Sequence, residues 1–199
     1  MSPAATFTID DADRLILDTA DTLFYERGIS GVGMAEIRDA SGVSLRRIYG
    51  LYPSKRDLVA AWLNDRHDRW MRWFTDTVDR HVARGADPVL AAFDALREWR
   101  RSPGYRGCAF INAIAEPMEI DDQHRAIVAD HKRSLVGHLA TLATRNTQAT
   151  RTRPQTPAWF AAALAVLIDG AIVQSVIFGN DKPIAAARKA AAQLQKTMP

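Results

Sequence analysis

The sequence predicts an all-α protein of about nine helices in two domains. Apolar residues recur at the three-to-four-residue spacing of a helix face over most of the 199 residues. Glycines, prolines and short polar runs interrupt that spacing, and no stretch shows the strict alternation of a half-buried strand. A chain of this length can bury a sizeable core, and its 47% apolar and 25% charged content is ordinary for a globular protein.

Cysteine usage and the first residues bear on the compartment. The single Cys108 excludes an intramolecular disulfide and fits a reducing compartment. Residues 1–10 show no basic segment followed by an apolar run, so we expect no secretory signal and a cytoplasmic protein. Cys108 is expected to be a small buried side chain, while a redox role would require a reactive thiolate and stays open.

The first helix is expected to end just before Gly28. Ile16, Ala20, Leu23 and Phe24 follow helical spacing and form one apolar stripe. Gly28 can adopt the left-handed conformation that commonly terminates a helix.

The stretch from residue 34 to residue 55 predicts two short helices joined by a tight turn. Apolar residues at helical spacing give residues 34–40 one apolar face. Gly42 supplies the left-handed backbone that a sharp turn needs, and Val43 can fill the space between the helices. Ser44 is a suitable N-cap for the second helix, residues 45–51.

That second helix carries Arg46 and Arg47 on its first turn and Tyr49 further on. A short helix with cationic and aromatic side chains on a supporting helix suits entry into a DNA major groove. The alternative is an ordinary pair of antiparallel helices, which would need no arginine pair. One arginine could read guanine O6 and N7, and the other is expected to bind phosphate.

Charge supports this interpretation only locally. The net charge is +3, and residues 1–60 hold nine Asp or Glu against seven Lys or Arg. Four cations lie within eleven residues with no acid between them: Arg46, Arg47, Lys55 and Arg56. We therefore expect a modest number of phosphate contacts per operator half-site.

The first 60 residues also resemble the DNA-binding domain of the tetracycline-repressor (TetR) family of bacterial transcription regulators. The resemblance covers about 50 residues and rests on Ile16-Leu17, Ala20, Phe24, Gly28, Gly42-Val43-Ser44, Tyr49, Tyr52 and Pro53-Ser54-Lys55. It implies a three-helix helix-turn-helix domain at residues 1–54 and a larger helical effector-binding and dimerisation domain at residues 55–199. It also implies that Tyr49 and Lys55 contact phosphate.

Some positions depart from the family pattern. Arg46 and Arg47 stand where small or hydroxyl residues are common, and Gly33 stands where the family usually has Ser or Thr. Gly50 would cost about 1 kcal/mol in a helix relative to Ala, so it either lets the backbone approach DNA or relieves crowding between helices. Operator preference is expected to depend on the arginines and Gly50. The candidate DNA-binding residues are Ser44, Arg46, Arg47, Tyr49 and Lys55.

A helix of about 30 residues is expected from Lys55 to Arg84. It would connect the two domains, so that tilting it in one domain moves the recognition helix in the other. Its tryptophans follow helical spacing, which is more often a property of core residues than of a ligand site.

The next two helices are expected at residues 88–101 and 107–116. Asn112 and Glu116 lie four residues apart and share a helix face, which either lines a pocket or faces water. The candidate effector-binding residues are Trp70, Trp73, Trp99, Phe110, Asn112 and Glu116. The four aromatic ones indicate an apolar or aromatic effector.

A long helix is expected to begin at Asp121. His124, His131 and His138 repeat along it every seven residues, a rise of roughly 10.5 Å that is too long for two of them to share a metal ion. A solvated stripe is the default interpretation, and a polar seam or a pH-sensitive face is the alternative. We expect no metal and no cofactor.

The most apolar segment is residues 158–178. Asp169 and Gln174 interrupt it, so we expect a buried helix and no membrane span. Small residues follow in the last helix, residues 183–198. The resemblance implies that these last two helices pair with their symmetry mates to form a homodimer.

Together these features predict a sequence-specific transcriptional regulator, a repressor that a small molecule releases from a palindromic operator in double-stranded DNA. A dimer is also required physically, because one short helix makes too few contacts for specificity. An enzyme would need a nucleophile–base or metal set, and the sequence shows none, so we expect no catalysis. A protein-interaction scaffold is the alternative from another class, and it would keep the helices but bind no DNA.

Overall fold

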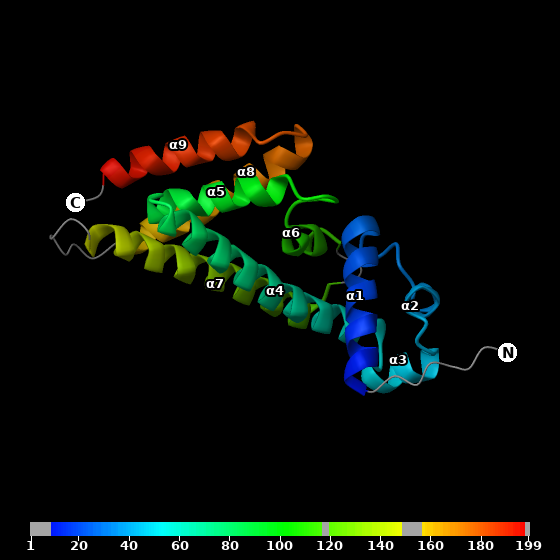
Figure 1. The fold of residues 1–199 in the computed structure, drawn as a ribbon. Coiled ribbons are helices and arrows are strands. Elements are labelled where there is room, and N and C mark those ends of the chain that lie inside the picture. The colour runs from blue at the N-terminus through cyan, green and yellow to red at the C-terminus, as the bar shows by residue number, and fades with distance from the viewer. Residues whose placement is uncertain (1–8, 117–119, 149–156, 198–199) are drawn as a thin grey trace. The chain divides into compact units, whose positions relative to one another are not determined.

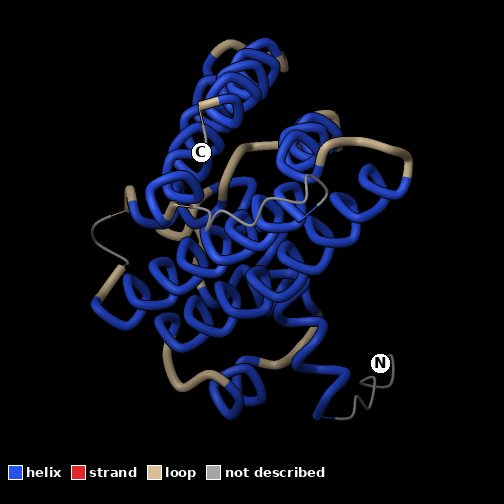
Figure 2. Tube along the Cα trace, turned by 90° about the vertical axis from the view of Figure 1, so that its left-hand side faces the viewer, coloured by secondary structure: helices blue, strands red, loops and turns tan. Residues whose placement is uncertain are grey.

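The computed structural model describes residues 9–116, 120–148 and 157–197. Within these ranges every regular element is a helix (Figures 1 and 2), which confirms the predicted all-α class. In chain order the helices are α1 (Ile9–Arg27), α2 (Met34–Ser41), α3 (Leu45–Leu51), α4 (Lys55–Ala83), α5 (Pro88–Arg100), α6 (Ala109–Ile114), α7 (Asp122–Gln148), α8 (Ala158–Ile177) and α9 (Lys182–Lys196).

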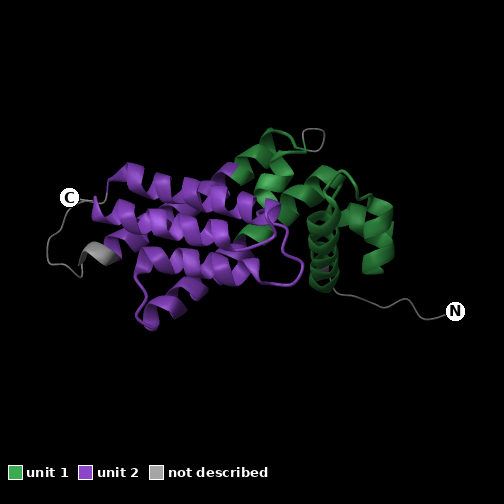
Figure 3. Cartoon of the chain, turned by 90° about the horizontal axis from the view of Figure 1, so that it is seen from above, with its two compact units in different colours: residues 1–67, 109–128 green, residues 68–108, 129–199 purple. Residues whose placement is uncertain are grey.

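The chain divides into two compact units (Figure 3). Unit 1 consists of residues 1–67 and 109–128, and unit 2 consists of residues 68–108 and 129–199. Helices α4 and α7 each contribute to both units. The domain boundary predicted after residue 54 marks the end of the helix-turn-helix motif, whereas the two units are defined by packing. That boundary stays a prediction.

The core of unit 1 forms around α1. Its stripe residues Ile16 and Ala20 are fully buried, as are Ile37 of α2 and Ile48 of α3. Gly28 ends α1 with φ +81° and donates its amide to the Phe24 carbonyl at 3.0 Å, so the predicted C-cap is present.

The first half of α4 packs against α1 through an aromatic and polar contact. The Trp62 ring meets Phe24 edge to face, with 5.3 Å between centroids. The Trp62 indole N–H donates to Asp21 at 2.8 Å, and the Arg66 guanidinium lies 4.0 Å from the centre of the Tyr25 ring. An aromatic pair with a satisfied indole favours one packing arrangement over looser ones.

Unit 2 is built around α5, α8 and α9, with α9 packed along both of the other helices. The Asp87 carboxylate caps α5 by accepting from the amides of Val89 and Leu90 at 2.9 and 3.0 Å. Phe93 and Leu96 of α5 are fully buried.

Helix α8 is apolar on all sides, yet much of it is exposed in the single chain. Val166, Ile177 and Phe178, the last directly after the helix, expose 72%, 69% and 63% of their surface. The expectation of a buried helix therefore holds for the side of α8 that carries Leu164 and Ile168 and is wrong for the side that carries Val166. Composition alone does not show which side of an apolar helix the fold covers. By length and composition α8 could also cross a membrane, a property that core and interface helices of globular proteins share.

The solvated-stripe interpretation of the three histidines is also wrong. His124 and His131 expose 0% and 2% of their surface, and His138 is half-buried. Within unit 1, a ring nitrogen of His124 lies 2.9 Å from the Arg56 carbonyl. Within unit 2, His131 contacts the Trp70 ring edge to face, and burial lowers the pKa of His138.

Candidate nucleic-acid interface and effector region

The turn between α2 and α3 has the geometry that the sequence predicts. Gly42 has φ +70° and donates its amide to the Arg38 carbonyl at 2.9 Å. Val43 is 2% exposed and fills the space beside the turn. The Ser44 hydroxyl accepts from the Arg47 amide at 3.4 Å, which caps α3.

The inner side of α3 is fixed by burial. Ile48 is fully buried and Tyr52, just after the helix, is 7% exposed. The Tyr52 hydroxyl donates to the Asp13 carboxylate of α1. Burial first, and then this bond to a carboxylate, raise the pKa of Tyr52, so the phenol stays a neutral donor.

The outer side of α3 presents the predicted DNA-binding residues. Ser44 and Arg46 are exposed, and Tyr49 exposes 45% of its surface. Arg47 and Lys55 are partly exposed. The fold thus brings the five candidates onto unit 1 at and beside one short helix, with the apolar residues of that helix turned inward.

Gly50 also lies on the exposed part of α3, and no heavy atom lies within 4 Å of a Cβ placed there. The interpretation that Gly50 relieves crowding between helices is therefore wrong. Close approach of the backbone to DNA is the interpretation that stays open.

Carboxylates in unit 1 neutralise several cations nearby. Arg56, one of the four local cations, pairs with Asp121 at 2.9 Å, and on α1 Arg14 pairs with Asp18 and Asp65. A hydrogen bond from the His124 amide is the main reason that the pKa of Asp121 lies below its usual value.

Glu116 occupies a position that helical spacing could not show. Its carboxylate accepts from the Ile29 amide at 3.0 Å and from the Ser30 amide at 2.7 Å, directly after α1. Burial alone would raise the pKa of Glu116, but the hydrogen bonds from Ser30 and Ile29 hold it below its usual value. The two other candidate effector-binding residues of this segment differ in exposure, since Phe110 is buried and Asn112 is exposed.

The three candidate tryptophans meet in unit 2. The Trp99 ring lies 5.6 Å from Trp70 and 6.4 Å from Trp73, measured between centroids. Tyr105 contacts Trp99 at 5.0 Å, and Phe74 stacks on Trp70 at 4.8 Å. Sequence reasoning missed Tyr105 and Phe74 as members of this aromatic cluster, although Phe74 lies four residues after Trp70 on the same helix.

Two buried ring nitrogens beside this cluster have no hydrogen-bond partner among the described residues. They are Trp70 Nε1 and His138 Nε2, and His138 contacts Phe74 edge to face. Because an unpaired buried donor costs free energy, such a nitrogen is suited to a ligand that brings a hydrogen-bond acceptor.

Cys108 is buried, as predicted, at 6% exposure. The Lys132 ammonium lies 3.8 Å from its sulfur and pairs with Asp169 at 2.6 Å.

The outward surface of α8 and α9 holds an apolar groove of about 300 Å³. Its lining includes Val166, Gly170, Gln174, Ala186 and Ala190. Small residues on α9 let another helix approach closely, as the sequence predicts for a helix-pairing surface.

Comparison with known proteins agrees with this architecture. The family described as "Bacterial regulatory proteins, tetR family" matches residues 16–62. The family described as "Tetracyclin repressor-like, C-terminal domain" matches residues 85–191, more than half of the chain. No curated protein matches the sequence.

Several solved structures share the fold along the whole chain. The reduced form of NemR from E. coli is 20% identical, covers 95% of this chain and 98% of its own, and has a TM-score of 0.79. A TetR-family regulator from Streptomyces coelicolor is 26% identical over 100% of this chain and 96% of its own, with a TM-score of 0.78. A TetR regulator from Chloroflexus aurantiacus is 19% identical over 96% of both chains, also with a TM-score of 0.78. With a helix-turn-helix unit and a C-terminal helical domain both matched, the chain belongs to the TetR family of DNA-binding transcriptional regulators.

Proposed function

We propose that this protein is a repressor that binds a palindromic operator as a homodimer and leaves it when a small apolar or aromatic molecule binds. The observation that carries the proposal is α3, whose inner side is held by Ile48 and Tyr52 while its arginines and Tyr49 face outward. Regulators of this family are generally not enzymes, and the proposal involves no catalytic step, metal or cofactor. It places the protein in the cytoplasm, where the operator is.

In the operator complex, Arg46 is positioned on the first turn of α3 to read a guanine edge. Arg47, Tyr49 and Lys55 bind phosphate, and Ser44 keeps the helix start in register by capping it. Direct readout by so few side chains requires a second copy of α3 on the other half-site.

The second copy is held through α8 and α9. Val166, Ile177 and Phe178 are large apolar side chains exposed in the single chain. A homodimer that buries the same patch on both subunits removes this surface from water.

The effector stacks against the aromatic cluster of unit 2. Trp70, Trp73 and Trp99 supply ring faces, and Trp70 Nε1 supplies a donor with no partner in the described part of the chain. A planar aromatic molecule that carries one carbonyl group meets both requirements. For Phe110, Asn112 and Glu116, which belong to unit 1, effector contact stays a prediction.

Release follows from the path of α4, which runs through both units. An effector that contacts Trp70 and Trp73 on α4 favours a different tilt of this helix. Because α3 is followed at once by α4, a change of tilt moves the recognition helices out of register with the operator.

A gel-shift titration against fragments of the neighbouring promoter tests this function at two salt concentrations. We expect sequence-selective binding that weakens steeply as salt rises. An absence of selective binding at about 100 mM salt would overturn the proposal and favour a scaffold that binds no DNA.

A further inference from the structure

His124 is the first of the three histidines that repeat along α7, and the function proposed above gives it no role. The residue lies in unit 1 and is fully buried. Because a buried polar side chain is stable only where its hydrogen bonds are made, the partners of the imidazole ring show what His124 does in the fold.

One ring nitrogen of His124 binds the main chain of α4. Its Nε2 lies 2.9 Å from the carbonyl oxygen of Arg56. A carbonyl oxygen only accepts, so Nε2 carries the proton and donates it to this contact. Arg56 is the second residue of α4 and His124 is the third residue of α7. The bond therefore ties the first turns of the two helices together.

The other ring nitrogen of His124, Nδ1, faces Asp121. It lies 2.7 Å from a carboxylate oxygen and 3.2 Å from the amide nitrogen of that residue. Nδ1 thus has an acceptor beside it when the ring is charged and a donor beside it when the ring is neutral. Nε2 keeps its proton in both forms, so the bond to the Arg56 carbonyl is kept as well.

Asp121 also holds the side chain of Arg56. Its carboxylate pairs with the guanidinium at 2.9 Å and accepts from the His124 amide at 3.0 Å. The guanidinium is largely exposed, and an exposed ion pair contributes little. A hydrogen bond made by a buried side chain is stronger, because the local dielectric constant is low. His124 is therefore the main link between α7 and the start of α4.

The start of α4 lies next to the proposed DNA-binding residues in sequence. Arg56 directly follows Lys55, a proposed phosphate contact, and only residues 52–54 separate α3 from α4. Pro53 restricts the backbone of this short connection. A shift of the first turn of α4 would therefore move Lys55 and the end of α3 together.

We propose, building on the proposed function, that His124 is a positioning residue for operator binding. Its bond to the Arg56 carbonyl holds Lys55 and the end of α3 in the arrangement that fits the operator. His124 is buried and does not contact DNA itself. Selective binding requires such an arrangement because base contacts tolerate little displacement, whereas non-specific binding depends mainly on charge.

Gel-shift titration of full-length His124→Phe against the selected promoter fragment and random-sequence DNA tests this role. Phenylalanine keeps a planar ring but has no donor, so we expect the affinity for the promoter fragment to fall about tenfold. The affinity for random-sequence DNA should stay the same. Unchanged affinity for the promoter fragment overturns the inference. An equal loss on both DNAs also overturns it, because that result would indicate general damage to unit 1.

His124→Gln is the conservative variant. The glutamine amide can donate an N–H near the position of Nε2. We expect this variant to bind the promoter fragment within about threefold of the wild-type affinity. A loss as large as that of His124→Phe would contradict a role for the donor.

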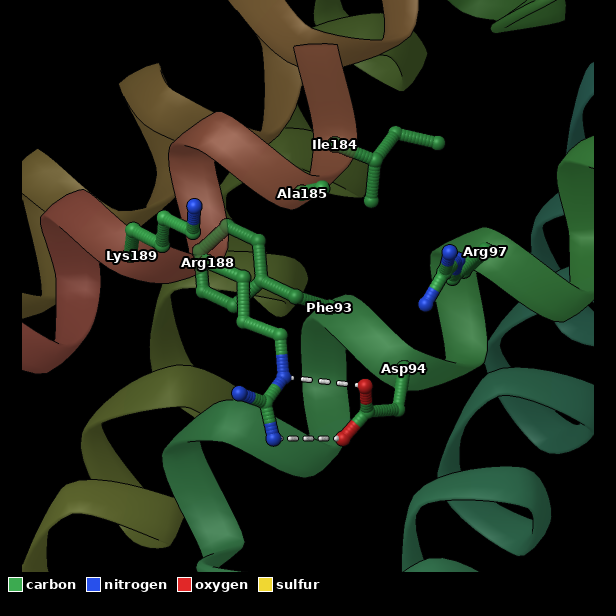
Figure 4. Close-up of a pocket in the computed structure, with 7 residues that line it drawn as sticks. All are labelled: Phe93, Asp94, Arg97, Ile184, Ala185, Arg188 and Lys189. Atoms are coloured by element: carbon green, nitrogen blue, oxygen red, sulfur yellow. Dashed lines mark hydrogen bonds and ion pairs between the residues drawn. The ribbon is translucent and has the colours of Figure 1, made fainter. Parts of the chain in front are cut away.

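Asp94→Ala is the control for loss of a contact between two helices. Asp94 of α5 accepts from two guanidinium nitrogens of Arg188 of α9, at 2.9 and 3.1 Å (Figure 4). This contact lies within unit 2 and does not involve α4. We expect Asp94→Ala to unfold at a lower temperature and to bind the promoter fragment as the wild type does. A loss of binding equal to that of His124→Phe would contradict a specific role of His124.

Hydrogen exchange of the full-length protein without DNA tests the hold on α4 separately from the proposed function. The amides of Tyr52 and Leu58 donate to the Ile48 and Ser54 carbonyls on either side of the connection. We expect both amides to exchange about tenfold faster in His124→Phe and at the wild-type rate in Asp94→Ala. Unchanged exchange in His124→Phe overturns the inference. A wild type that binds no promoter fragment selectively overturns the proposed function, and the exchange rates then still decide whether His124 holds α4.

Discussion

The carboxylate of Glu116 accepts a hydrogen bond from the Ser30 amide at 2.7 Å, across 86 residues of sequence. The Ile29 amide donates a second hydrogen bond, at 3.0 Å, so the carboxylate accepts from two consecutive amides. The carboxylate satisfies two backbone donors where α1 has just ended, and Gly28 lies so close that its added Cβ would be 3.1 Å from the carboxylate. Unit 1 therefore depends on α6 and its flanking residues as well as on the three helices of its N-terminal motif.

Replacing Glu116 should make the stability of unit 1 less dependent on pH. The folded pKa of Glu116 lies below its ordinary value of 4.5, so its contribution is complete above that value and is lost as pH falls through the folded pKa. We expect Glu116→Gln to lower the free energy of unfolding at neutral pH by about 1 kcal/mol, after allowance for partial exposure. At a pH below the folded pKa of Glu116 both proteins carry a neutral side chain, and the difference should shrink.

Urea unfolding at the two pH values measures this effect. Glu26→Gln is the control, since Glu26 is an exposed acid of α1. A Glu116→Gln penalty that is equal at both pH values would mean that the charge of Glu116 does not contribute to the contact.

Gly50→Ala should separate folding from DNA binding. The added methyl group meets no atom within 4 Å, and alanine favours a helix over glycine, so the free energy of unfolding should rise by about 0.5–1 kcal/mol. If the backbone of α3 lies against DNA at this point, the same methyl group weakens operator binding. Thermal unfolding and gel shifts measure the two quantities, and a more stable variant with unchanged affinity would place Gly50 away from the DNA.

Arg46→Ala and Arg47→Ala should each weaken operator binding without changing the dimer. We expect Arg46→Ala to lose about 1–3 kcal/mol of binding free energy, with relaxed preference at the base pair that Arg46 is proposed to read. Arg47→Ala, which removes a proposed phosphate contact, should weaken binding to all DNA sequences alike and reduce the salt dependence of binding. Arg84→Ala, at an exposed position of unit 2, is the control. Loss of the dimer on a sizing column would contradict the assignment.

Val166→Arg should convert the proposed dimer to a monomer. This side chain is 72% exposed in one chain and lies in the groove of α8 and α9, so a charge there would be buried without a partner on dimerisation. Operator binding should fall with it, while the helical content of each chain should persist. Sedimentation velocity measures the change, with Ser134→Arg on exposed α7 surface as control. A Val166→Arg protein that remains dimeric would place the interface elsewhere.

Trp70→Phe should change which aromatic molecules bind unit 2. The variant keeps an aromatic face but removes Nε1, the buried donor without a partner in the described ranges. With acetophenone and ethylbenzene as probes of nearly equal shape, we expect acetophenone to lose about 1 kcal/mol of binding and ethylbenzene to lose little. Quenching of the remaining tryptophans reports the binding. Equal losses for the two probes would show that Nε1 does not recognise a carbonyl group.

The sequence by itself determined the helices and the turn that carries α3. Gly42 and Ser44 act on backbone groups within four residues of themselves, so their roles could be inferred from local spacing alone. Helical period also predicts that Ile48 and Tyr52 face inward, because it decides which residues share a face, and both are buried. The family resemblance supported the DNA role, which the net charge of residues 1–60 could not do.

Only the tertiary structure decided which distant groups meet. Helical spacing could not show that Glu116 would bind Ser30, that His124 and His131 would be buried, or that Arg188 would pair with Asp94 across 94 residues. Each of these contacts depends on how separate helices pack, and a polar residue looks the same in sequence whether water or a distant partner satisfies it. For α8 the composition indicated burial, but the fold leaves large apolar side chains such as Val166 exposed in the single chain.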